Sequence, residues 1–245
     1  MPRSAGSSVL CALLTGVVMV QGTALAQNPP SAPQNPGQPA RTPPSIERLG
    51  DNLLRVGKIR VDTKAREISV AGTVNDVQTL EFIANAAGGF KAYESALSLD
   101  TDAISFNLSL LLIGLDRKDA VVPTKHFDPV TPKGDPVEIW VEFDSAGKRT
   151  RIRAEELVYN LHTKKTLAPD SWVYTGSTFV ADSNAYMADL EGTLIGFVHT
   201  PAPVIEHAGT VAGPYGASRL NPNLKLEAGT RVTLTIRALP KTDKR

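Results

Sequence analysis

The sequence predicts an α+β fold, mainly antiparallel β with one buried helix at about residues 103–113, in a single compact domain. Three observations carry this prediction. Short segments that alternate polar and apolar residues recur along the chain, as strands with one buried face do. One longer apolar run has the start and stop signals of a helix. No proline- or glycine-rich linker interrupts residues 45–245, which favours one domain.

Several segments predict strands. Residues 137–143 (VEIWVEF) alternate most clearly. Residues 58–62 and 67–74 flank a short turn at residues 63–65 and therefore predict a hairpin. Further strands are predicted for residues 149–154, 172–174, 192–199 and 230–239.

The segment around Gly88 and Gly89 allows two interpretations. Residues 80–84 (LEFIA) and 90–99 (FKAYESALSL) flank the two glycines, which favours a β-hairpin. In the alternative, Asn75-Asp76 caps a short helix that runs through residues 77–83.

The predicted helix has a recognisable beginning and end. Asp102 is a favourable N-cap residue, and residues 103–113 carry a dense apolar pattern. Gly114 follows where a glycine commonly ends a helix. The nearly continuous apolar character predicts that this helix is buried on most sides.

The first 44 residues carry signals of export rather than of folding. Arg3, the apolar residues 9–20 and the Ala24-Leu25-Ala26 cleavage pattern predict a signal peptide over residues 1–26. That apolar run has 12 residues, fewer than the ~20 needed to span a bilayer. We therefore expect no stable membrane span after cleavage, and a retained N-terminal anchor is the alternative.

Residues 27–44 form a proline-rich linker before the globular domain at residues 45–245. Seven of these 18 residues are proline, which favours an extended polyproline-II spacer. A PxxP-type ligand is the alternative. Together with the signal peptide, this layout predicts a periplasmic or secreted protein.

Charge and cysteine content exclude several classes of protein. The chain has 26 Lys+Arg against 25 Asp+Glu, a balance that argues against nucleic-acid binding through phosphate neutralisation. Its one cysteine, Cys11, lies in the predicted signal peptide. The mature chain would therefore have no disulfide and no thiolate-bound metal or iron–sulfur cluster, and we predict no cofactor.

Two groups of residues have weak signals of chemistry. His199, Glu206 and His207 are weak metal-ligand candidates, but adjacent residues point in opposite directions on a strand, which favours surface loop histidines instead. Glu81 and Glu94 would lie on facing arms of the predicted hairpin, where paired carboxylates can serve acid–base chemistry. The alternative is that they face solvent or pair with Lys91 and Arg66.

Ordered sequence segments resemble a known family. They are LEFIANAAGGFKAYESALSL, LLLIGL, VEIWVEF, SWVYTGS, MADLEG and FVHTPAPVIEH. Over about residues 57–237 the chain resembles the YdjY-domain family of exported bacterial proteins. The resemblance implies export and a shared fold, and it implies no reaction. Members often have His where this chain has Tyr93, so a metal or proton-transfer role does not carry over to that position.

The matching segments also suggest where a functional surface would lie. Glu94, Trp172, Ser177 and Asp189 are the candidate binding residues. Trp172 also fits a plain core role, because a tryptophan is commonly buried.

These features predict a non-catalytic envelope binding or assembly module whose partner is another envelope protein. One alternative is a metal-binding protein or hydrolase that uses Glu81, Glu94, Asp189 and either His162 or His199. The other alternative is a carrier of a small apolar ligand, whose signature would be an apolar cavity beneath the helix.

Overall fold

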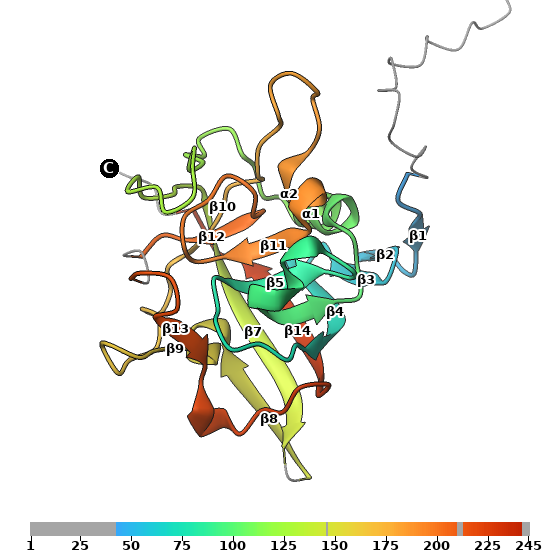
Figure 1. The fold of residues 1–245 in the computed structure, drawn as a ribbon. Coiled ribbons are helices and arrows are strands. Elements are labelled where there is room, and N and C mark those ends of the chain that lie inside the picture. Colours follow the sequence, from blue (N-terminus) through green and yellow to red (C-terminus); the bar gives the residue numbers. More distant parts are fainter. Residues whose placement is uncertain (1–42, 146, 210–212, 242–245) are drawn as a thin grey trace, which may run out of the picture. The chain divides into compact units, whose positions relative to one another are not determined.

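A mixed eight-stranded β-barrel with added strands forms the centre of this computed structural model, which describes residues 43–145, 147–209 and 213–241 (Figure 1). The predicted signal peptide and all but the last two residues of the predicted linker lie outside the described residues. No helix in the described ranges is long and apolar enough to cross a membrane.

The barrel follows the order β4–β14–β7–β10–β12–β11–β5–β6, and β6 pairs with β4 to close it. Gly72 of β4 lies opposite Leu99 of β6 at this closure. A Cβ atom at Gly72 would lie 2.7 Å from the Ser98 carbonyl oxygen, so the close approach of the two strands requires glycine. The strands are β4 (Glu67–Val74), β14 (Arg231–Ala238), β7 (Asp135–Ser145), β10 (Trp172–Tyr174), β12 (Ile205–His207), β11 (Thr193–Gly196), β5 (Phe82–Ala86) and β6 (Ser95–Leu99).

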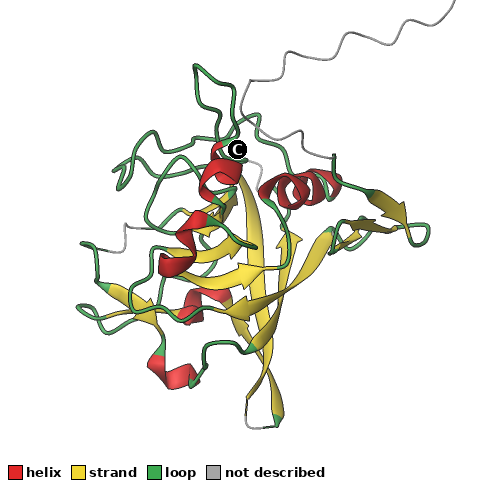
Figure 2. Ribbon diagram, turned by 45° about the vertical axis from the view of Figure 1, so that its right-hand side comes forward, coloured by secondary structure: helices red, strands yellow, loops and turns green. Residues whose placement is uncertain are grey.

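Further strands and helices are attached to this barrel. Strands β1–β3 extend the sheet from β4, β8 pairs with β7, and β9 pairs with β13. Figure 2 shows α1, α2 and long loops near one end of the barrel, with the β7–β8 hairpin at the other. The added elements are β1 (Ile46–Arg48), β2 (Leu53–Val56), β3 (Ile59–Asp62), β8 (Lys148–Arg153), β9 (Val158–Asn160), β13 (Ser218–Leu220), the 3-10 helices η1 (Phe90–Glu94), η2 (Ala154–Leu157) and η3 (Pro222–Leu224), and the helices α1 (Ala103–Leu112) and α2 (Met187–Glu191).

The alternating segments are strands, as predicted. In β4 and in the first nine residues of β7, buried residues alternate strictly with partly buried ones, because one face of each strand lines the barrel interior. β3 and β4 form the predicted antiparallel hairpin. The predicted strands near β8, β10 and β14 are also confirmed to within one or two residues. The strand predicted over residues 192–199 ends earlier, at Gly196.

The predicted hairpin around Gly88 and Gly89 is wrong, and so is the alternative helix over residues 77–83. β5 and β6 lie side by side but run parallel, with Phe82 opposite Ser95. The chain reverses twice between the two strands, because residues 90–94 form the 3-10 helix η1 instead of continuing a strand. The fold is therefore mixed rather than simply antiparallel.

The predicted helix is α1, and its predicted caps are confirmed. Asp102 Oδ1 accepts a hydrogen bond from the Ser105 amide at 2.7 Å, and Gly114 has a left-handed backbone with φ of 85°. Burial on most sides was overestimated, because Phe106 is buried in the core while Leu111 is 45% exposed. The second short helix, α2, was not predicted. The described fold is mainly β, as predicted, but it is a mixed barrel and not an α+β arrangement.

Candidate functional site

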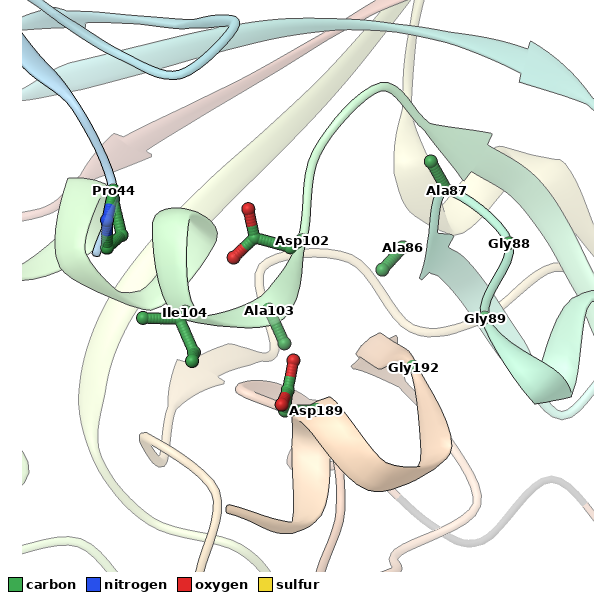
Figure 3. Close-up of a pocket in the computed structure, with 10 residues that line it drawn as sticks. All are labelled: Pro44, Ala86, Ala87, Gly88, Gly89, Asp102, Ala103, Ile104, Asp189 and Gly192. Carbon is green, nitrogen blue, oxygen red and sulfur yellow. The ribbon is translucent and has the colours of Figure 1, made fainter. Parts of the chain in front are cut away.

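An open pocket of about 400 Å³ lies where α1, α2 and the segment after β5 meet (Figure 3). Asp102, Ala103 and Ile104 line it from the first turn of α1, and Asp189 lines it from α2. The remaining lining residues are Pro44, Ala86, Ala87, Gly88, Gly89 and Gly192. Small residues on the β5 side thus leave room between the two helices.

Two glycines hold this side of the pocket together. Gly192 ends α2 in a left-handed conformation with φ of 71°, and a Cβ atom there would overlap Gly89 Cα. A Cβ atom at Gly89 would in turn lie 2.9 Å from the Gly192 carbonyl oxygen, which accepts a hydrogen bond from the Ala86 amide at 2.7 Å. The end of α2 and the start of η1 are therefore packed backbone against backbone.

Carboxylates from two separate elements line the pocket. Figure 3 shows the Asp189 carboxylate, on α2, directed toward Ala103 at the start of α1. The two Asp102 oxygens accept hydrogen bonds from the Ser105 amide at 2.7 Å and the Ser105 hydroxyl at 2.6 Å. These bonds orient Asp102 as the helix cap while its carboxylate still forms part of the pocket wall.

Large apolar side chains are exposed on the elements beside the pocket. Phe90 is 72% exposed, Tyr93 is 54% exposed, and Leu190 is 49% exposed. The Phe90 and Tyr93 rings contact each other edge to face, with centroids 5.9 Å apart. Because Gly89 and Gly192 join the elements that carry these three residues, we refer to the three as the η1–α2 patch.

A cluster of ionisable side chains includes residues of η1 and α2, the two elements that carry this patch. Lys91 Nζ and Glu94 Oε1 are 2.6 Å apart, and the Glu81 amide donates to the Glu94 carbonyl oxygen at 2.9 Å. His126 Nε2 contacts Glu81 Oε2 at 3.0 Å from a distant loop. Glu191, the last residue of α2, completes what we call the carboxylate cluster, since the charges of Lys91, His126 and Glu94 all act on it.

Burial dominates the electrostatics of the carboxylate cluster. Desolvation, followed by the nearby Glu94 carboxylate, raises the pKa of Glu81, against the lowering effect of His126. Burial likewise raises the pKa of Glu191. Burial alone would lower the pKa of Lys91, but its hydrogen bonds with Glu94 and Tyr93 reverse the direction and raise it.

The cluster can hold a proton, but it leaves little room for a substrate. Glu81 and Glu94 are 2% and 3% exposed, so the prediction that they face solvent is wrong, as is the predicted pairing with Arg66, which donates to the Ile113 carbonyl oxygen instead. Glu81 Oε1 is buried without a hydrogen-bond partner. A cavity that touches Glu81 holds only about 10 Å³, close to the minimum for one water molecule.

Three of the four predicted binding residues lie around α2. Asp189 lines the pocket, and Glu94 lies in the carboxylate cluster with Glu191. Ser177 is buried beneath α2, where its hydroxyl accepts from the Ala188 amide at 3.2 Å and donates to the Ala202 carbonyl oxygen at 2.6 Å. Trp172 lies in the core at 1% exposure, with its ring edge to face against His207.

The weak metal-ligand candidates are engaged with the main chain. His199 Nδ1 and Nε2 contact the carbonyl oxygens of Asp128 at 3.1 Å and His207 at 3.0 Å. His207 Nε2 contacts the Ala168 carbonyl oxygen at 2.8 Å. Both histidines are buried, so the prediction of surface loop histidines is wrong for them.

Glu206 is also buried, and its Oε1 atom accepts from the Thr200 amide at 3.1 Å. Within residues 43–145, 147–209 and 213–241, no group of three or more His, Cys, Asp or Glu side chains is arranged to hold a metal ion.

Sequence reasoning missed two members of the carboxylate cluster, Glu191 and His126, whereas the predicted pairing with Lys91 is confirmed for Glu94. Lys91 lies three residues before Glu94, and this short spacing made their ion pair predictable. Glu191 is brought to the cluster by α2, which was not predicted. His126 is 45 residues from Glu81, and no local pattern links residues so far apart.

Comparison with known proteins gives one match. A family model described as the YdjY domain matches residues 59–237. No curated protein matches the chain, and no solved structure matches it.

Proposed function

The chain belongs to the YdjY-domain family, and from this premise we propose that it is an exported, non-catalytic binding and assembly module that recognises another protein of the cell envelope. The observation that carries the proposal is the open pocket beside the three exposed side chains of the η1–α2 patch. Exposed apolar side chains that lie close together, as the Phe90 and Tyr93 rings do, are typical of protein interaction sites, and aromatic side chains are enriched among the residues that dominate binding energy.

The backbone around the pocket supports this function. Glycine-to-glycine packing at Gly89 and Gly192 joins η1 to α2, and the Lys91–Glu94 ion pair stabilises η1 itself. A preformed surface loses less conformational freedom on binding than a loose one, which favours affinity. The carboxylate cluster then acts as the support of the recognition surface.

The hydrolase alternative has weaker support. Two of its three carboxylates, Glu81 and Glu94, are closed off from solvent, whereas a general acid or base must come within hydrogen-bond reach of its substrate. The third, Asp189, lines the open pocket. The apolar-carrier alternative is also weaker, because Phe106 and Leu110 fill the space beneath α1. The pocket lies beside the first turn of that helix and is lined by two carboxylates.

Export follows from the predicted signal peptide over residues 1–26. We expect the protein purified from the envelope of its host to begin at Gln27, because the Ala24-Leu25-Ala26 pattern precedes that residue. N-terminal sequencing and intact mass measure this directly. A chain that retains Arg3 would instead support the membrane-anchor alternative.

Site-directed photocrosslinking in the native host tests the binding function. A photoreactive residue in place of Leu190 is expected to capture one reproducible envelope partner. The control places the same residue at Lys148, which is exposed at the end of β8 away from α2 (Figure 1). Capture of the same proteins from both positions, or of none from position 190, would contradict the proposal.

A further inference from the structure

The geometry points to the chemistry of the partner: a polypeptide segment that places a lysine or arginine side chain in the pocket while its neighbouring residues cover the η1–α2 patch. This inference rests on the proposed binding function and narrows it.

Charge in the pocket is the first step of the argument. Two of its lining residues, Asp102 and Asp189, are acidic, and none of the described lining residues is basic. A carboxylate has about four acceptor positions, so the two bonds from Ser105 leave Asp102 able to accept more. A cationic side chain between the α1 cap and α2 would meet carboxylates from both elements.

The cationic side chains of the carboxylate cluster already have acidic partners. Glu81, Glu94 and Glu191 belong to the carboxylate cluster, and the Lys91 ammonium is already paired with Glu94 at 2.6 Å. His126 is the other cationic group of the cluster when it is protonated, and it contacts Glu81. Lys91 and His126 are thus each held by a carboxylate of the cluster, and the attraction for a basic segment comes from Asp102 and Asp189 in the pocket wall.

The exposed rings suit the same partner. Lys91 Nζ lies 5.6 Å from the centroid of the Tyr93 ring, so this ring already receives one cation while 54% of the residue remains exposed. Aromatic rings attract lysine and arginine heads through their π faces, and the aliphatic stems of these residues pack on apolar surface. Phe90 and Leu190 supply that surface.

The patch also explains why the ligand is a polypeptide and not a small cation. A small cation would fill the pocket and leave Phe90, Tyr93 and Leu190 uncovered. A segment of several residues buries all three around a central charged anchor, the usual arrangement of a protein interface.

A titration followed by NMR tests this chemistry in the full mature chain. The probe is Nα-acetyl-arginine amide, and the matched neutral probe is Nα-acetyl-glutamine amide. We expect the arginine probe to shift the amide resonances of Gly88, Gly89 and Gly192 in a saturable way that weakens as salt rises. Asp189→Asn should raise the dissociation constant of the arginine probe about tenfold. Glu227→Gln, at an exposed glutamate that does not line the pocket, should leave that dissociation constant unchanged.

Equal shifts with both probes, no salt dependence, or shifts confined to other residues would overturn the inference. The salt series needs only the wild-type chain, so it decides the matter even if Asp189→Asn fails to fold. Continued capture from position 190 without an arginine response would leave the binding function standing and refute the partner chemistry. Loss of both responses would refute both proposals.

Discussion

Glu206 is a buried acid on a strand of the barrel. Its side chain is fully buried in β12, where Oε1 accepts from the Thr200 amide and Oε2 has no hydrogen-bond partner. Burial raises the pKa of Glu206 to about 8, against the lowering effect of the backbone amides of Thr200 and His199. The residue is therefore mostly a neutral acid at neutral pH.

Replacing this acid with its amide should change how stability depends on pH. Between the ordinary pKa of 4.5 and about 8, the unfolded chain releases a proton that the folded chain retains. Stability contributed by this group therefore falls as pH rises through that window, by about 1.4 kcal/mol per pH unit. Glu206→Gln keeps an acceptor for Thr200 and should remove that slope, measured by urea unfolding across the window.

The matched control is Glu227→Gln, at an exposed position, which should leave the slope as it is in the wild type. Burial raises the pKa of Glu81 and Glu191 as well, so some slope of the same sign should remain in Glu206→Gln. An unchanged slope in that variant would show that Glu206 titrates normally in the folded protein.

At the scale of the elements, the junction of α2 with η1 positions the pocket and the patch together. Gly192 and Gly88 both have left-handed backbones, with φ of 71° and 70°. The two positions differ in the room available for a side chain. A Cβ atom at Gly192 would overlap Gly89 Cα, while a Cβ atom at Gly88 would have no neighbour within 4 Å. Comparing substitutions at the two glycines therefore distinguishes the cost of a left-handed backbone from the cost of a steric clash.

Gly192→Ala should therefore be the more destabilising substitution. Gly88→Ala should cost about 1 kcal/mol from the left-handed backbone alone. Gly192→Ala should cost about 1–3 kcal/mol more, because the backbone atoms it meets cannot move aside easily. Urea unfolding of the two variants measures the difference, and equal losses would mean that α2 and η1 are not packed as described.

β5 and β6 show why local patterns have limits. The alternation in β4 was readable because one face of that strand is buried and the other is only partly so. All five residues of β5 are buried, so no alternation marks its faces. Its parallel pairing with β6 depends on the 3-10 helix η1 between the two strands. The Gly88-Gly89 pair is typical of a hairpin turn, so nothing in the sequence indicated η1.

At the scale of the whole molecule, closure of the barrel is what joins the two ends of the sheet. β6 supplies this closure between β5 and β4, and Leu97 at its centre lies opposite Ala84 on one side and Val74 on the other. Leu97 is 0% exposed. Its side chain therefore packs where three strands meet.

Leu97→Ala should destabilise the whole domain in one transition. Removal of a buried leucine side chain costs about 2–5 kcal/mol, and all probes of unfolding should shift together if the barrel is one cooperative unit. Leu111→Ala, at a residue that is 45% exposed on α1, should change stability by only about 0.5 kcal/mol. Similar losses in both variants would argue against a closed barrel.

Local patterns in the sequence predicted most of the barrel strands, the helix α1 and the family. Alternation marked strands such as β4 and β7, Asp102 and Gly114 marked the ends of α1, and ordered segments marked the YdjY domain. The parallel pairing of β5 with β6, the contact of Glu81 with His126 and the pocket between α1 and α2 became visible only in the folded chain. The physical reason is that caps and alternation depend on neighbouring residues, whereas strand pairing and side-chain clusters join residues far apart in the chain.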